Sequence, residues 1–337
     1  MKLKRFTKST YTFLILAMLV NQVMGASSIT TFNYNHVTLG RSKLLTVYLP
    51  DGYDGTKYFP TLYLLHGGGG NNTDWTTSGN AKSTLDNAIS TGNAKAMIVI
   101  MPSVDGLAMD VFTKELVNDI IPYTEKNYRA IAAKDSRALA GLSMGGLMTL
   151  DAGLYRHELF GYLGVFSSGW LNTSSSTPYA TFLKSKGEAV ATSIHYFYWS
   201  DGGASEIAYQ NGLRSMAILK DNGVAIDEYI SRSGGHSFTT WKADLVDFIP
   251  HLFIDAVTSV DDNQNSAISV FPSPFTDGIE ISSNQTFKFI FYTLEGKEME
   301  KGHGFGNQIT GRLLPQGNYI LQVQTGKNIN SFKVLKK

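Results

Sequence analysis

The feature that most constrains this chain is a five-residue turn, Gly-Leu-Ser-Met-Gly, which runs from Gly141 to Gly145. Small and apolar residues precede it, as at the end of a buried strand. The residues from Gly145 to His157 have the apolar spacing of a helix. A serine between such a strand and helix sits in a strained turn with its hydroxyl exposed, the arrangement called a nucleophile elbow. The sequence therefore predicts that Ser143 is a nucleophile. The alternative is a glycine-rich turn without chemical use.

Strands and helices alternate along most of the chain. Residues 27–50 alternate apolar and polar side chains, which predicts an antiparallel hairpin. Further strands are expected at 59–65, 96–101, 162–166, 194–199 and 226–231, and helices at 79–91, 109–128, 207–222 and 238–253. This order favours a mostly parallel sheet with helices on both faces. In such sheets the loops at the carboxyl ends of the strands form the site.

The two ends of the chain have different compositions from this region. Residues 1–26 begin with basic side chains, continue with the short apolar run 11–20 and end with small residues, which predicts a secretory signal peptide. A membrane anchor is the alternative, but the apolar run is short for a spanning helix. The α/β domain is expected at 27–256, followed by a polar linker at 257–266. Residues 267–337 contain short alternating strands and predict a small all-β sandwich without a catalytic cluster.

Composition excludes several classes of function. The formal net charge is +1, so no electrostatic attraction to nucleic acid or to an anionic membrane is implied. The chain has no cysteine, which excludes disulfides, thiolate catalysis and zinc bound by cysteine. No metal or organic cofactor is expected.

A serine hydroxyl needs a neighbouring base to become nucleophilic. His66 lies in a glycine loop and is expected to hold that loop by a hydrogen bond, whereas His157 ends a predicted helix, where a cation suits the helix dipole. His236 lies in a Gly-Gly-His loop after the last strand of the α/β region, downstream of the serine. The α/β-hydrolase fold has the chain order Ser, acid, His. We therefore predict His236 as the base, with an ordinary surface histidine as the alternative.

The third member should be a carboxylate in the loop after strand 194–199. Asp201 and Glu206 are both present there, and the residues alone do not separate them. Either could fix the tautomer of the imidazole and stabilise its charged form. Two backbone N–H groups are also needed for the oxyanion. The expected donors are Met144, next after the serine, and Gly68 in the loop from His66 to Gly70.

Residues from about 40 to 255 resemble the feruloyl and acetyl-xylan esterases of the esterase-D-like group, carbohydrate esterase family 1. The matching blocks are Leu62–Gly70 with Asp74-Trp75, Ile121-Pro122-Tyr123, Asn127-Tyr128, Ala138–Gly146, and Gly234–Phe238 with Trp241. The family's acid lies in a Gly-x-x-Asp element that aligns with Gly203-Ala204-Ser205-Glu206. The resemblance thus implies Glu206 as the acid, with glutamate in place of aspartate. The segment from Pro102 to Met109 is shorter than is usual in the family.

The C-terminal region resembles the sorting domain of the type IX secretion system. The resemblance is carried by Val270–Phe275, Tyr292–Lys297, Gly317-Asn318-Tyr319 and the lysine-rich end. It implies the type IX machinery as a partner and a secreted or outer-surface location.

Together the residues and the resemblance imply a secreted serine carboxylesterase that removes feruloyl or acetyl groups from plant xylan. The alternatives are an acyltransferase on the same scaffold and an inactive, surface-displayed carbohydrate-binding protein. Trp75 is the candidate substrate contact, and Trp170, Tyr179 and Trp199 could line the same pocket. For each of them a place in the hydrophobic core is the alternative.

Overall fold

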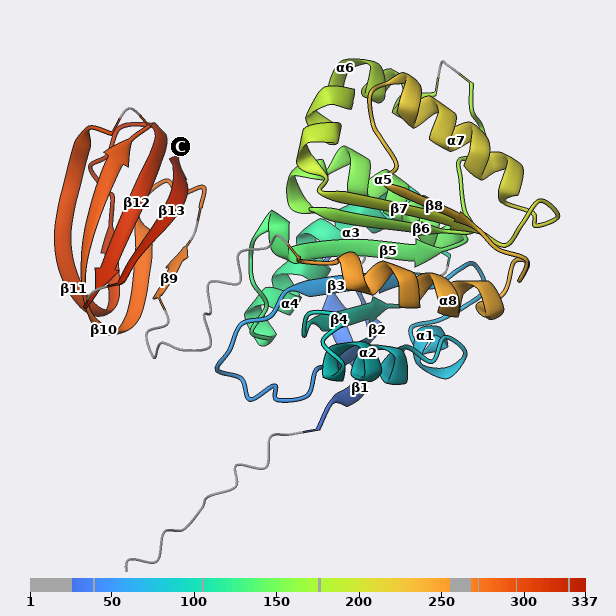
Figure 1. Cartoon of the computed structure of the whole chain (residues 1–337), viewed down its shortest axis with the longest axis horizontal. Coiled ribbons are helices and arrows are strands. Elements are labelled where there is room, and N and C mark those ends of the chain that lie inside the picture. The colour runs from blue at the N-terminus through green and yellow to red at the C-terminus, as the bar shows by residue number, and fades with distance from the viewer. Residues whose placement is uncertain are drawn as a thin grey trace, which may run out of the picture. The chain divides into compact units, whose positions relative to one another are not determined.

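The computed structural model describes residues 26–38, 40–104, 106–174, 177–254, 268–271, 273–294, 296–326 and 328–337. The predicted signal peptide, except for its last residue, and the predicted linker lie outside these ranges. The chain divides into two compact units, Met1–Ala256 and Val257–Lys337. Their elements are labelled in Figure 1.

The first unit is built on a mixed sheet with the strand order β1-β2-β4-β3-β5-β6-β7-β8 (Figure 1). The strands are β1 (Ser28–His36), β2 (Arg41–Leu49), β3 (Thr61–Leu65), β4 (Ile98–Pro102), β5 (Arg137–Leu142), β6 (Tyr162–Phe166), β7 (Tyr196–Asp201) and β8 (Glu228–Ser231). β1 and β2 form the predicted antiparallel hairpin, and β2 is also antiparallel to β4. All other neighbours are parallel. The predicted mostly parallel sheet is confirmed.

Helices cover both faces of this sheet (Figure 1). One face packs against α1 (Asp74–Thr77), α2 (Ala81–Ser90) and α8 (Phe238–Phe248). The other packs against α3 (Met109–Glu115), α4 (Ile121–Asn127), α5 (Met144–Tyr155), α6 (Pro178–Ser193) and α7 (Tyr209–Asp221). Because side chains alternate along a strand, each central strand contributes to both cores. Leu62 and Leu64 of β3 belong to the first core, and Tyr63 and Leu65 to the second.

Two helical segments differ from the prediction. The stretch expected as one helix, 109–128, is α3 and α4 joined by a π-helical turn at Leu116–Ile120. Helix α6, which precedes β7, was not predicted at all. Its buried residues include the small Ala180 and Gly187 beside Leu183 and Val190, so its apolar signal is weak.

The second unit is an antiparallel all-β structure, as predicted. Its strands are β9 (Ile268–Phe271), β10 (Ile279–Thr293), β11 (Glu298–Thr310), β12 (Gly317–Thr325) and β13 (Asn328–Lys336). Hydrogen bonds join them into one sheet in the order β11-β10-β12-β13, with β9 paired to β10. A pairing irregularity between Ser283 and Phe287 divides β10, so β9 pairs with its first part and β12 with its second. Phe287, Phe289 and Phe291 lie in the core of this unit.

In the described part of the chain, no helix combines the length and the apolar character needed to cross a membrane.

Candidate active site

Ser143 lies at the turn between β5 and α5, in a backbone conformation that side chains rarely adopt. Its φ is 52° and its ψ is −116°, and such a conformation persists only where the surroundings hold it. The Ser143 N–H donates to the carbonyl of Phe166 at 2.9 Å. The Ser143 carbonyl accepts from the hydroxyl of Ser168 at 2.6 Å. The strained turn is therefore fixed to the end of β6.

The glycine that follows permits a close approach between two elements. A Cβ at Gly145 would lie 2.4 Å from the carbonyl oxygen of His66. Only glycine lets α5 begin this close to the end of β3. The contact brings the serine turn and the glycine loop after β3 together.

His236 follows β8 and reaches the serine. Its Nε2 lies 2.9 Å from the Ser143 Oγ, a hydrogen-bonding distance. The imidazole also packs edge-to-face against Trp241, with 5.1 Å between the ring centroids. Ser237 caps α8 by accepting a hydrogen bond from the Thr239 N–H. The His236 side chain remains 21% exposed, so a substrate can approach it.

Of the two candidate carboxylates, Glu206 lies beside His236. Its Oε2 is 3.5 Å from His236 Nδ1, and its side chain has no exposed surface. Neither oxygen of Glu206, nor His236 Nδ1, has a hydrogen-bond partner in the described part of the chain. The separation is at the long limit for a hydrogen bond, and such bonds in catalytic sites often tighten when substrate binds.

Asp201, the other candidate, is occupied elsewhere. Its carboxylate accepts hydrogen bonds from the Gly203 N–H at 2.8 Å, the Ser231 hydroxyl at 2.6 Å and the Tyr229 hydroxyl at 2.5 Å. Burial is the largest cause that raises the pKa of Tyr229, and the hydrogen bond to Asp201 raises it further. The phenol therefore keeps its proton and acts as the donor. No hydrogen bond or ion pair among the described residues joins Asp201 to His236. The geometry favours Glu206 as the partner of the histidine.

The expected oxyanion donors, Gly68 and Met144, lie close together. A Cβ at Gly68 would come within 2.9 Å of the Met144 Cε. Among the described loops and turns, no hydrogen bond uses the N–H of either residue. Met144 is also the first residue of α5, and the N-terminus of a helix carries partial positive charge.

His66 holds the glycine loop, as expected. Its Nε2 accepts from the Val104 N–H at 2.9 Å, so Nδ1 must carry the proton. Nδ1 then donates to the Gly67 carbonyl at 2.7 Å. With 1% of its surface exposed, His66 is a structural residue of the loop.

The prediction that Trp75 contacts substrate is wrong in this structure. Its side chain is 1% exposed and packs edge-on against Phe166 and Phe238. Its indole N–H donates to the carbonyl of Leu65 at 2.9 Å, so it supports the end of β3. Trp199 is also fully buried. The sequence signal, a tryptophan near a glycine loop, is the same for a core residue and a surface residue.

Trp170 and Tyr179 form a stacked pair, with ring centroids 3.8 Å apart and planes 11° apart. Trp170 is 5% exposed, and its backbone N–H donates to the Ser215 hydroxyl. Its indole is therefore mainly a core residue between the loop after β6 and α7.

A partly buried cluster of charged side chains at the start of the histidine loop was not predicted from the sequence. Arg232 donates to Asp244 at 2.7 Å, and also to Asp247 and Tyr198. Burial raises the pKa of Asp244 to about 6, and the contact with Arg232 opposes this shift only in part. Burial alone would lower the pKa of Arg232, but its hydrogen bonds to these partners outweigh it and raise that pKa. The cluster ties the start of the histidine loop to α8.

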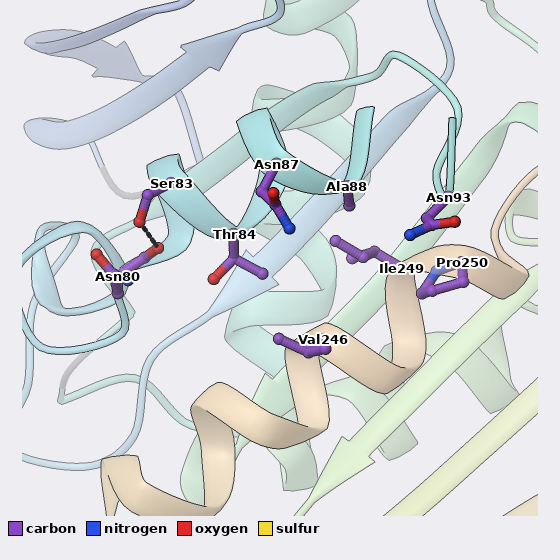
Figure 2. Close-up of a pocket in the computed structure, with 9 residues that line it drawn as sticks. All are labelled: Asn80, Ser83, Thr84, Asn87, Ala88, Asn93, Val246, Ile249 and Pro250. Carbon is purple, nitrogen blue, oxygen red and sulfur yellow. Dashed lines mark hydrogen bonds between the residues drawn. The ribbon is translucent and has the colours of Figure 1, made fainter. Parts of the chain in front are cut away.

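A groove of about 540 Å³ lies away from these residues, between α2 and α8 (Figure 2). Polar, uncharged side chains of α2 such as Thr84 and Asn87 face Val246 of α8 and Ile249, which directly follows α8, across it. None of the predicted site residues lines it. Within the described residues, no group of three or more histidine, aspartate and glutamate side chains is placed to hold a metal ion.

Comparisons with known proteins give two family matches. The model described as "putative esterase" matches residues 37–252, and the model described as "secretion system C-terminal sorting domain" matches residues 269–337. Among curated proteins, the endo-1,4-beta-xylanase/feruloyl esterase of Xylanibacter ruminicola is 32% identical over 230 residues. The match covers 64% of this chain but only 30% of that protein.

Solved structures agree on the fold. The ferulic acid esterase of Anaeromyces mucronatus aligns with a TM-score of 0.60 and 23% identity, over 69% of this chain and 92% of its own. The feruloyl esterase module of Clostridium thermocellum aligns with a TM-score of 0.57 and 24% identity, over 68% and 89%. The first unit has the predicted α/β-hydrolase fold.

Proposed function

Because this chain belongs to the putative esterase family, we propose that it is a secreted serine carboxylesterase acting on acylated polysaccharide. The observation that carries the proposal is the 2.9 Å contact between Ser143 Oγ and His236 Nε2. Ser143 follows β5 and His236 follows β8. A buried carboxylate, that of Glu206, lies beside the imidazole. A serine, an acid and a histidine, in this chain order, perform acyl transfer through an acyl-enzyme.

In the proposed mechanism, Ser143 Oγ attacks the ester carbonyl while His236 Nε2 takes the hydroxyl proton. The charge on the substrate oxygen is held by the N–H groups of Gly68 and Met144. The carbon–oxygen bond to the alcohol then breaks, and His236 returns the proton to the departing alkoxide. Glu206 orients the imidazole and stabilises its charged form. Water, activated by the same histidine, attacks the acyl-serine and releases the carboxylic acid.

The proposed substrate is plant xylan that carries feruloyl or acetyl esters. This rests on the matching blocks of the sequence and on the relative named a xylanase/feruloyl esterase. The inactive-protein alternative depended on the departure from aspartate at the acid position. A carboxylate beside His236 argues against it.

The proposed route out of the cell uses both ends of the chain. Residues 1–26 would serve as the signal peptide and be removed. After the catalytic domain (27–256) and the linker (257–266), residues 267–337 would be read by the type IX machinery. The match of residues 269–337 to a secretion sorting domain supports this part of the proposal.

The experiment that tests the function compares two substrates and one control. Purified protein is assayed for release of ferulate from methyl ferulate and of acetate from acetylated xylan, beside Ser143→Ala. We expect hydrolysis of at least one ester by the wild type and none above background by the variant. Equal activity of the two proteins would rule out Ser143 as the nucleophile. Addition of xylo-oligosaccharide acceptors would reveal an acyltransferase through new ester products.

A further inference from the structure

We propose that Asp201 is a positioning residue, which sets the place of Glu206 relative to His236 without touching either. The inference rests on the proposed function and concerns how its acid is held. Asp201 is the last residue of β7 and is 4% exposed. It therefore lies at the base of the loop that carries Glu206.

No side-chain hydrogen bond among the described residues fixes the carboxylate of Glu206. Both of its oxygens are buried, and its Oε2 lies 3.5 Å from Nδ1 of His236. Because no such hydrogen bond holds the carboxylate, its position depends on where the backbone places Glu206. The conformation of the loop from Asp201 to Glu206 thus decides whether the acid reaches the imidazole.

Asp201 fixes the first turn of this loop by a hydrogen bond. Its Oδ1 accepts from the N–H of Gly203, whose φ of 99° is a conformation that favours glycine. The chain then closes a second turn, in which the Glu206 N–H donates to the Gly203 carbonyl at 3.0 Å. The carboxylate of Asp201 is therefore connected to Glu206 through two consecutive turns.

The same carboxylate binds the strand that leads to His236. It accepts hydrogen bonds from the hydroxyls of Tyr229 and Ser231, both on β8. The Asp201 carbonyl also accepts from the Arg232 N–H at 2.9 Å. Asp201 is thus the point at which the acid loop and the histidine loop are tied to each other.

Further along, the two loops touch directly. The Gly235 N–H donates to the Gly202 carbonyl at 2.9 Å. A Cβ at Gly202 would lie 2.1 Å from the Gly235 carbonyl oxygen, so this contact leaves no space for a side chain. A change at Asp201 should therefore alter the position of Glu206 relative to His236.

The test is a double-mutant cycle with Asp201→Asn, Glu206→Gln and the double variant, read as kcat and KM on a p-nitrophenyl ester. The asparagine keeps the size of the side chain but cannot accept all three hydrogen bonds. We expect Asp201→Asn to lower kcat by about 10- to 100-fold with KM unchanged, the effect of a small misplacement. In the Glu206→Gln background, Asp201→Asn should cause no further loss, because there is no carboxylate left to position.

Two outcomes would overturn the inference. If Asp201→Asn lowers kcat by the same factor in both backgrounds, Asp201 does not act through Glu206. If Glu206→Gln retains most of the activity while Asp201→Asn loses it, Asp201 is itself the acid.

Tyr229→Phe and Ser231→Ala are milder variants, for use if Asp201→Asn does not fold. Each removes one donor and should produce a smaller loss of kcat that again disappears in the Glu206→Gln background. Reaction of wild-type Ser143 with a fluorophosphonate separates this test from the proposed function. An unreactive Ser143 refutes the function itself, whereas a reactive serine with an additive cycle refutes only the role of Asp201.

Discussion

Asp201 and Glu206 are two carboxylates in one loop, and their surroundings differ completely. Asp201 accepts three hydrogen bonds, whereas Glu206 lies beside His236 with no hydrogen-bond partner among the described residues. A sequence pattern could not separate them, because the difference arises from a glycine turn at φ 99° and from two side chains on β8. Ser143 and His236 were predictable because each lies in a short motif whose geometry is local.

Burial and ion pairing oppose each other at Asp244, and burial dominates. Its pKa is raised to about 6 by burial, above the value of about 3.9 in an unfolded chain. The folded protein therefore binds an extra proton between about pH 4 and pH 6, and the free energy of unfolding falls as the pH rises through this window. The loss amounts to about 3 kcal/mol at most.

This effect should be visible in the variant Asp244→Asn, which cannot titrate at this position. We expect the stability of the wild type relative to the variant to decrease between pH 4 and pH 7. Chemical denaturation of both proteins at several pH values measures the difference. A relative stability that rises with pH would mean that the pair with Arg232 outweighs burial.

At the scale of elements, strands were easier to predict than helices with small buried residues. The strands β3 to β6 are completely buried and mostly apolar, which gave continuous signals. Helix α6 buries alanine and glycine, and β11 is rich in glycine and polar residues, so neither has a clear apolar period. In β10 the residues from Ser282 to Thr286 are all polar and interrupt the alternation of apolar side chains, so its full length has no continuous signal.

The contact between α5 and the end of β3 predicts a strong effect of Gly145→Ala. The new methyl group would lie 2.4 Å from the His66 carbonyl oxygen, so the elbow or the glycine loop must move. We expect a loss of about 1–3 kcal/mol in unfolding free energy, the range for overpacking. Because the proposed oxyanion donors, Gly68 and Met144, lie on these two segments, kcat of the folded variant should fall as well.

Gly92→Ala is the matched control. Gly92 has a φ of 74°, but a Cβ added there would meet no atom within 4 Å, so the variant is expected to lose some stability and no activity. Thermal unfolding and steady-state kinetics of both variants make the comparison. Full activity in Gly145→Ala would show that the close approach is not needed for the site.

At the scale of the whole molecule, the proposed chemistry and the proposed export signal occupy different units. The residues of the candidate site all lie before Ala256, and the sorting-domain match begins at residue 269. The all-β class of the second unit was predictable from its alternating strands. Its strands form a single sheet because the long strand β10 pairs with β9, β11 and β12. No local sequence pattern indicates these pairings.

This separation predicts the outcome of a truncation. In a bacterium with the matching secretion system, a chain that ends at residue 256 should keep the same kcat/KM but no longer reach the medium or the cell surface. Esterase assays on cell lysate, cell surface and medium, for the full and the truncated chain, measure both effects. Unchanged export of the truncated chain would contradict the assigned role of residues 269–337.

The central claim is that His236 activates Ser143, and covalent labelling tests it most directly. A fluorophosphonate reacts with a serine only when a base has made it nucleophilic. Wild-type protein and His236→Ala are treated with the probe, and the modified peptide is identified by mass spectrometry. We expect a single adduct on Ser143 in the wild type, formed at least about 10³-fold more slowly in the variant. An adduct on another residue, or equal rates in the two proteins, would contradict the account.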